Sequence, residues 1–510
     1  MTDAQHPEPE HDLKTAAEHG VRWAAISRPA IEVVLLASMV VIARLISPAE
    51  YGRFAVVTAL SELAIAIPSQ GVGTAMVQME SVTRRHQQAG ALLGIGISVV
   101  LVALAYILGW LVIGPVFGGR TEHLVHLATP GFLLAGIAAV PMAMLTRRLE
   151  FKWLSLIDVG NTMTRAAASV ALALAGLNAE ALIYGGLLAG ALATGIALIK
   201  APPPLPRYER DAVRDIRRLG VPAAGAALSW VGFRNCDYAI VGARLGAVQA
   251  GLYFRAYTLA VEYQKKVSLV VGQVGFPVLA RATSPEALEE MRGRMVQVLS
   301  VVLFPLLAIL AVTAPVLIPF VFGDDWAPAV APTQVLALGG ASTLVIDAIG
   351  ASLMARRRTH TVLVFGWAHF VVYAGAVLLI APLGLTAVAL GAALIHTGFM
   401  VVGYWLMLRD SDERLWTCIA DDLAPAVVSC VVLAGGALAV DVVLNAANVG
   451  EAARLVLVST AGGVTYLVAL RGLFPKTWDL VLGFAGGVVP ANRLPRLHRG
   501  LVLLARTSEG

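Results

Sequence analysis

Charged residues are scarce in this sequence of 510 residues. They make up 14% of it, whereas 58% of the residues are hydrophobic and the mean hydropathy is +0.77. Soluble globular chains carry about a quarter charged residues, and a water-soluble fold of this length could not bury so much apolar surface. The composition therefore excludes a soluble enzyme and predicts an integral membrane protein whose solvent is the bilayer.

Cysteine and the common catalytic motifs are also scarce. The three cysteines, Cys236, Cys418 and Cys430, form no CxxC pair and have no histidines at metal-ligating spacing, so neither a disulfide framework nor a metal site is expected. Walker A, GxSxG and HExxH sequences are absent. We expect no cofactor, no direct use of ATP and no enzymatic activity. The polar stretch 1–19 has no apolar core of its own and is expected to be a cytoplasmic tail, not a signal peptide.

Long apolar runs dominate what remains. Runs of roughly 20 residues, the length that crosses a bilayer, predict about fourteen transmembrane helices. They fall near 24–46, 53–77, 89–113, 124–146, 154–176, 180–199, 219–245, 251–280, 295–322, 329–354, 361–381, 384–408, 420–444 and 452–473.

Basic residues gather in alternate loops between these runs. They include Arg84-Arg85, Arg147-Arg148, the series within 207–218, and Arg356 to Arg358. The positive-inside rule places these loops, and with them both termini, in the cytoplasm. The net charge of +5 reflects this bias, so the expected partner is an anionic lipid leaflet and not nucleic acid.

Four short matches, in the same order, relate the two halves of the chain. They pair Ala43-Arg44-Leu45 and Gly52 with Ala243-Arg244-Leu245 and Gly251, 113–118 with 318–323, Arg147-Arg148 with Arg356-Arg357, and 176–182 with 384–390. An even number of helices per repeat gives both halves one orientation, related by an axis along the membrane normal. Such a repeat favours alternating access over a static pore.

The predicted fold is thus all-α and integral to the membrane: two six-helix bundles in a parallel pseudo-two-fold repeat, followed by a helical pair. We expect a monomer divided as follows: an N-terminal tail at 1–20, a six-helix bundle at 21–200, a basic linker at 201–218, a second six-helix bundle at 219–408, an extra helical pair at 409–473, and a cytoplasmic tail with an interfacial helix at 474–510.

Several segments resemble the polysaccharide transporter family. They are the stretch from Ala43 to Gly52, the stretch from Asn235 to Gly242, Gly251-Leu252-Tyr253, Phe276-Pro277, and the stretch from Phe322 to Trp326. This family comprises the Wzx-type oligosaccharide flippases, within the superfamily of multidrug, oligosaccharidyl-lipid and polysaccharide exporters. The resemblance implies a MATE-like fold in the bacterial inner membrane. It also implies movement of undecaprenyl-diphosphate-linked repeat units from the cytoplasmic to the periplasmic leaflet. An O-antigen, capsule or exopolysaccharide polymerase and a chain-length regulator would then be partners.

A lipid-linked oligosaccharide requires a wet cavity for its sugars and cations for its diphosphate. Ionisable residues inside the spans are the candidates, because a charge at the bilayer centre costs about 3 kcal/mol or more. The cations predicted to face a central cavity and bind the diphosphate are Arg28, Arg165, Arg234, Lys265 and Lys266. The carboxylates predicted to carry a coupling ion are Glu62, Asp237 and Glu262. A structural reading competes with each assignment: Arg28 can pair with Glu32, and Asp237 can simply neutralise Arg234. His369 and His396 are more often packing residues than proton relays.

Three other functions remain open at this point. A multidrug exporter or a lipid II flippase would share the superfamily fold, although multidrug exporters typically have an acidic cavity. A membrane-embedded glycan polymerase or ligase would need a large periplasmic loop, and the loops predicted on that side are short. The sugar, the polysaccharide pathway and the choice between proton and sodium coupling are not determined by the sequence.

Overall fold

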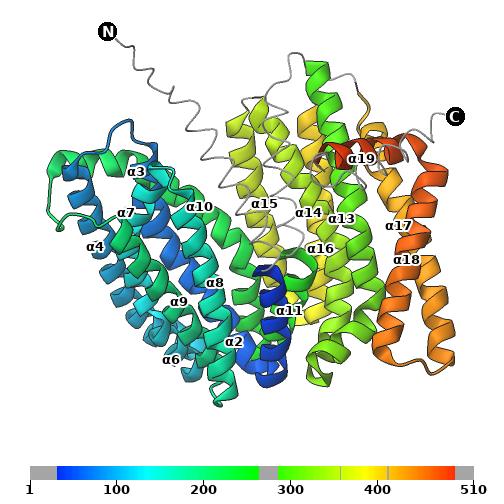
Figure 1. Ribbon diagram of the computed structural model, residues 1–510, viewed down its shortest axis with the longest axis horizontal. Helices are drawn as coiled ribbons and strands as arrows, with labels where there is room; N and C mark the ends of the chain where they lie inside the picture. Colours follow the sequence, from blue (N-terminus) through cyan, green and yellow to red (C-terminus); the bar gives the residue numbers. More distant parts are fainter. Residues whose placement is uncertain (1–30, 263–284, 357, 410–412, 489–510) are drawn as a thin grey trace, which may run out of the picture. The chain divides into compact units, whose positions relative to one another are not determined.

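The computed structural model describes residues 31–262, 285–356, 358–409 and 413–488, and within these ranges all regular secondary structure is helical. The expected all-α fold is therefore confirmed. The chain forms two compact units, Met1–Gly251 and Leu252–Gly510, which are taken separately below. Figure 1 shows the helices along the chain.

Long helices that pack against one another make up the N-terminal unit. Residues 31–45 are helical. The helices that follow are α2 (Pro48–Pro68), the π-helical turn η1 (Ser69–Gly73), α3 (Thr74–Gln78), α4 (Arg84–Leu108), the π-helical turn η2 (Gly109–Ile113), α5 (Gly114–Phe117), α6 (Gly119–Ala128), α7 (Pro130–Arg147), α8 (Phe151–Leu174), α9 (Ala179–Lys200) and α10 (Arg210–Leu245). Within this unit, α8 packs along α9, α4 along α7, and α10 along α2.

The C-terminal unit is built around α13 (Pro285–Phe322), which packs against α14 and α17. α11 (Ala247–Tyr257) crosses the boundary between the units. The other elements are η3 (Thr258–Glu262), η4 (Asp324–Ala329), α14 (Val330–Ala355), α15 (Thr359–Ile380), η5 (Ala381–Leu383), α16 (Leu385–Leu408), α17 (Leu415–Ala446), α18 (Glu451–Leu473) and α19 (Pro475–Val488). A single apolar core joins α13, α14 and α16 to α17 and α18. The extra helical pair predicted near the C-terminus is thus packed onto this unit.

Ten helices in the described ranges are long and apolar enough to cross a membrane. Each of the fourteen predicted runs overlaps a helix in those ranges, but the segments at 31–45, α8, α10 and α11 are not among the ten. The same four predicted runs carry the candidate charges Arg28, Arg165, Arg234 and Glu262. The count of fourteen spans and the proposed domain boundaries stay predictions.

The internal repeat reappears as repeated helix breaks. Gly118 and Gly323, which end the matched segments 113–118 and 318–323, have φ angles of 87° and 102°. Gly176 and Gly384, which begin the last matched pair, have φ angles of 91° and 102°. Only glycine adopts such angles without steric cost, so each pair terminates or starts a helix for the same reason.

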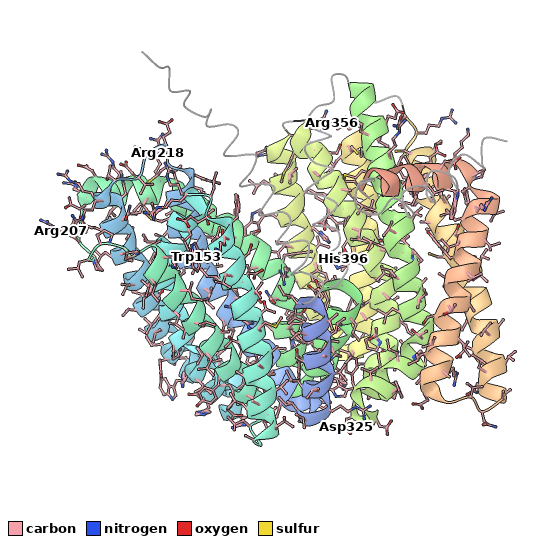
Figure 2. The ribbon with its side chains drawn as sticks, in the orientation of Figure 1. Trp153, Arg207, Arg218, Asp325, Arg356 and His396 are labelled. Atoms are coloured by element: carbon pink, nitrogen blue, oxygen red, sulfur yellow. The ribbon has the colours of Figure 1, made fainter. Side chains whose placement is uncertain are left out.

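Charge is unevenly distributed along each unit. Figure 2 shows Arg207 and Arg218 at one end of the N-terminal unit, and Arg356 and Asp325 at opposite ends of the C-terminal unit. Some of the basic residues also stabilise the fold: Arg147 donates hydrogen bonds to backbone carbonyls at the end of α3, including those of Met76 and Val77. The assignment of the basic ends to the cytoplasm stays a prediction.

Candidate functional site

A polar cavity of about 800 Å³ lies inside the N-terminal unit. Its walls come from the continuous rod α2–η1–α3 and from α9 and α10, with one residue each from α6, α7 and α8. Cavities that bind small molecules typically measure about 300–1,000 Å³. The polar cavity is therefore large enough for part of a sizeable ligand.

The rod formed by α2, η1 and α3 lines the cavity with a polar stripe. Between residues 58 and 78, every side chain that carries an N or O atom faces it: Thr58, Ser61, Glu62, Ser69, Gln70, Thr74 and Gln78. Thr58, Ser61, Glu62 and Ser69 share one face of a regular helix, whereas Gln70, Thr74 and Gln78 would be rotated away from that face. All seven line the cavity in a rod that contains the π-helical turn η1. Hydroxyl and amide groups in such a row can hydrogen-bond sugar hydroxyls.

A local irregularity of the backbone shapes this stripe. Pro68 has no N–H to donate, so the regular hydrogen-bond ladder breaks there and the next five residues form the π-helical turn η1. Such turns are frequent at functional sites. Ser69 Oγ donates to the carbonyl of Ile65 at 2.7 Å, and Thr74 Oγ1 donates to Gln70 Oε1 at 2.9 Å.

Glu62 lies in the middle of the stripe and is held by α10. Asn235 Nδ2 donates a hydrogen bond to Glu62 Oε2 at 3.0 Å and another to the carbonyl of Val231 at 3.0 Å. The Asn235 side chain is buried, and Val231 lines the cavity. The amide fixes one carboxylate oxygen of Glu62 and leaves the rest of the carboxylate toward the cavity.

Arg165 lines the same cavity from α8. The negative charge of the Glu62 carboxylate attracts the Arg165 guanidinium. Among the described residues, no acidic side chain lies within ion-pair distance of Arg165, and none of the recorded hydrogen bonds involves it. Its planar fork of N–H donors is thus open to an anionic ligand, and a phosphate can engage two of these donors at once.

The other predicted site residues that the structure describes do not line the polar cavity. Arg234 lies on α10, half-buried and outside the residues that line the cavity. Asp237 is buried on the same helix, and its Oδ1 accepts a hydrogen bond from the backbone N–H of Tyr238 at 2.9 Å. Arg28, Lys265 and Lys266 lie outside the described residues, and Glu262 is the last residue of η3. The structure thus brings together Glu62 and Arg165, and the predicted excess of cations around the substrate stays a prediction.

Sequence reasoning missed most of the polar stripe and the role of Asn235 toward Glu62. Part of the periodic signal was present: in the apolar run 54–78, the uncharged polar residues Thr58, Ser61 and Ser69 fall near one helical face. A search restricted to ionisable residues passes over such a stripe. Asn235 stands in one of the segments that resemble the transporter family, but nothing local to it indicates a partner more than 170 residues away.

Comparison with known proteins agrees with this architecture. The family model described as "Polysaccharide biosynthesis protein" matches residues 41–331, more than half of the chain. The chain belongs to this family. The match spans the polar stripe, Arg165 and Asn235, so the walls of the cavity lie within the part that defines the family.

Two curated relatives align with most of the chain. The teichuronic acid biosynthesis protein TuaB of Bacillus subtilis (strain 168) is 25% identical, over 91% of this chain and 97% of its own length. The lipopolysaccharide biosynthesis protein WzxC of Escherichia coli (strain K12) is 23% identical, over 78% of this chain and 82% of its own length. The resemblance to polysaccharide transporters inferred from the sequence is thereby confirmed.

Among solved structures, the lipid II flippase MurJ in its inward closed conformation superposes with a TM-score of 0.70 at 14% identity. The match covers 89% of this chain and 98% of MurJ. At this identity the likeness shows the fold. The chain is a multi-pass protein of the bacterial inner membrane with the architecture of a transporter.

Proposed function

We propose that this protein is a flippase that carries undecaprenyl-diphosphate-linked oligosaccharide repeat units from the cytoplasmic to the periplasmic leaflet, for the assembly of a surface polysaccharide. The observation that supports the proposal is the polar cavity, in which one open guanidinium, Arg165, faces a row of hydroxyl and amide groups. The names of TuaB and WzxC place both relatives in polysaccharide biosynthesis. The proposed activity moves its substrate and neither makes nor breaks a covalent bond.

Each part of the cavity corresponds to a part of such a substrate. Arg165 would bind the diphosphate through charge-assisted hydrogen bonds, which are worth about 1.5–3 kcal/mol each. The stripe from Thr58 to Gln78 would hydrogen-bond the sugars nearest the diphosphate. Glu62 would balance the charge of Arg165 while the cavity is empty. Once the diphosphate has bound the guanidinium, a coupling cation would bind the Glu62 carboxylate.

The charge distribution supports the topology that goes with this proposal, and the proposed substrate implies the partners. With the basic ends of the units in the cytoplasm, both termini lie on the side where repeat units are made. A polymerase that joins repeat units, together with a regulator of chain length, would take the flipped product on the periplasmic side. The protein would work as a monomer by alternating access, with Arg165 exposed first to one side and then to the other.

A deletion of the gene tests this function directly. We expect loss of one surface polysaccharide and accumulation of complete undecaprenyl-linked repeat units on the cytoplasmic face. The isolated lipid-linked pool would also identify the sugar. An intact polysaccharide with increased sensitivity to cationic drugs would contradict the proposal and support a multidrug exporter. Loss of cell-wall precursor transport would support lipid II as the substrate.

Complementation of the deletion tests the site. Arg165→Gln should reduce export by about tenfold or more, because it removes charge-assisted hydrogen bonds to the diphosphate. Arg165→Lys should retain part of the activity, since a point charge replaces the planar fork. Lys152→Gln is the matched control, because it removes an exposed cation from the same helix outside the cavity. Normal export by Arg165→Gln would refute the assigned role.

A further inference from the structure

A second concavity, the apolar cleft, lies on the N-terminal unit between α7, α8 and α9 and measures about 600 Å³. Its walls are Leu133 and Leu134 from α7, Leu172 from α8, and Leu187 and Leu188 from α9, together with other residues of which only Tyr184 carries a polar group. A cleft with this lining offers no hydrogen bonds to a sugar or a phosphate. It suits a hydrocarbon chain, which gains by contact with aliphatic side chains.

One residue, Leu187, lines both this cleft and the polar cavity, and Gly131 also lines the polar cavity. A Cβ placed on Gly131 would lie 3.4 Å from Leu187 Cδ2, so the leucine rests on the bare backbone of α7. Gly186, which precedes Leu187 on α9 and lines the polar cavity, has nothing within 4 Å of the place where its Cβ would be. Leu187 is therefore common to the two spaces, with a glycine beside it on both α7 and α9.

Arg165 and the residue through which α8 lines the cleft also lie on one face of that helix. Arg165 lines the polar cavity, and Leu172, seven residues later, lines the apolar cleft. Seven residues make two turns, which puts the two side chains on the same face about 10 Å apart along the helix axis. An amphiphile with its diphosphate at Arg165 would therefore have the cleft within reach of its chain, two turns along this face of α8.

We propose that the apolar cleft holds the hydrocarbon chain of the lipid-linked substrate while its diphosphate is bound at Arg165. This inference rests on the proposed function and adds to it the place of the lipid chain and the residue, Leu187, that lines the spaces of both chain and head group. An ordinary bilayer phospholipid also has a chain that fits the cleft, but its occupancy would not depend on the guanidinium in the neighbouring cavity. The dependence on Arg165 therefore distinguishes the two occupants.

The test uses full-length protein in phosphatidylcholine nanodiscs and a polyprenyl diphosphate that carries a photoreactive diazirine in its chain. After irradiation, peptide mapping should place the label on α7, α8 and α9 at the cleft. Unlabelled polyprenyl diphosphate should compete it away, whereas the same excess of phosphatidylglycerol should not. Equal competition by phosphatidylglycerol, or label placed elsewhere on the protein, would overturn the proposal.

Three variants make the test specific. Arg165→Gln should lower labelling at the cleft by about tenfold at limiting probe, since the diphosphate loses its charge-assisted contacts. Leu172→Trp should fill the cleft and remove most of the label, whereas Leu174→Trp on the same helix should not, because Leu174 is 67% exposed and lies outside the cleft. Undiminished labelling of Arg165→Gln would mean a general lipid site and overturn the proposal.

The outcome separates this inference from the proposed function. If Arg165→Gln loses export while the label in the wild-type protein lies outside the cleft, the flippase assignment stands and only the place of the chain is wrong. If export is normal in Arg165→Gln, the proposed site fails regardless of where the chain binds.

Discussion

Gly52 and Gly251 pack backbone against backbone in the N-terminal unit. A Cβ on Gly52 would lie 1.7 Å from the carbonyl oxygen of Ala247, and a Cβ on Gly251 would lie 1.9 Å from the carbonyl oxygen of Pro48. The two glycines are matched positions of the internal repeat, and Pro48 and Ala247 each stand four residues before them. Residues that contact each other reciprocally in this way are related as across a two-fold axis. The contact thus supports the repeat and shows why both positions are glycine.

We predict that Gly52→Ala and Gly251→Ala each destabilise the protein severely. The added methyl group would overlap a backbone carbonyl that cannot move without shifting a helix, at a cost of about 3 kcal/mol or more. The measurement is the yield and the elution profile of a fluorescent fusion solubilised in mild detergent.

Gly96→Ala is the matched control for this pair. Gly96 lies inside α4 and has nothing within 4 Å of its Cβ position. Alanine there should leave the profile unchanged or raise the free energy of unfolding by about 0.5–1 kcal/mol, because alanine loses less backbone entropy than glycine. A monodisperse, wild-type profile for Gly52→Ala would contradict the close packing of the two helices.

The C-terminal unit contains a buried ion pair that ties α17 to α13. Arg292 Nη1 donates to Asp422 Oδ2, and the two residues are only 2% and 4% exposed. Tyr404 Oη, from α16, donates to the same oxygen at 2.8 Å, and Arg292 Nη2 lies 3.1 Å from Cys418 Sγ. Three helices, the consecutive pair α16 and α17 and the more distant α13, therefore meet at one carboxylate.

We predict that Asp422→Ala lowers the free energy of unfolding by about 3–5 kcal/mol, because it leaves the charge of Arg292 buried without its counter-ion. The midpoint of thermal unfolding of the purified protein in a single detergent measures the effect. Replacing both partners together, as in Arg292→Met with Asp422→Leu, should recover most of the loss, since no uncompensated charge remains.

An exposed ion pair on the same helix gives the control. Glu290 and Arg294 pair one turn apart on α13, and their side chains are 64% and 61% exposed. Glu290→Gln should change the unfolding midpoint little, because exposed pairs contribute about 0–1 kcal/mol. Equal effects of Glu290→Gln and Asp422→Ala would show that burial does not determine the strength of the inner pair.

His369 and His396 form a hydrogen-bonded pair between α15 and α16. His369 Nε2 lies 3.0 Å from His396 Nδ1, and both rings are buried. The ring of His369 also stacks on Phe399 with their centroids 4.3 Å apart. A double-mutant cycle with leucine at each position should give a coupling energy of about 1 kcal/mol in thermal unfolding.

The same variants test whether the histidines only pack. If they do, the double variant His369→Leu with His396→Leu should retain export in proportion to the amount of folded protein. Folded protein at the wild-type level with export abolished would instead assign the pair a role in transport.

Much of the fold could be predicted from the sequence because the signals are local. Hydropathy over roughly 20 residues identifies a span wherever it stands in the chain. The paired glycines at 118 and 323, and at 176 and 384, end or begin helices through their own φ angles, so short motifs were enough to reveal the repeat. The all-helical membrane class followed from these features alone, whereas the family was inferred from the resemblance of segments such as 43–52 and 235–242.

The contents of the site depended on tertiary packing. Arg165 and Glu62 were singled out as buried charges, but only the packing of α8 against the other helices of the unit brings them to one cavity, and only α10 supplies Asn235 to Glu62. The pairing of Arg292 with Asp422, which are 130 residues apart, had no sequence signal. Helical periodicity determines which residues share a face of one helix, whereas the side chains of neighbouring helices decide what that face meets. For that reason the sequence by itself determined the membrane class, the all-helical fold and the family of this protein, and the tertiary structure decided the polar cavity, the apolar cleft and the leucine that lines both.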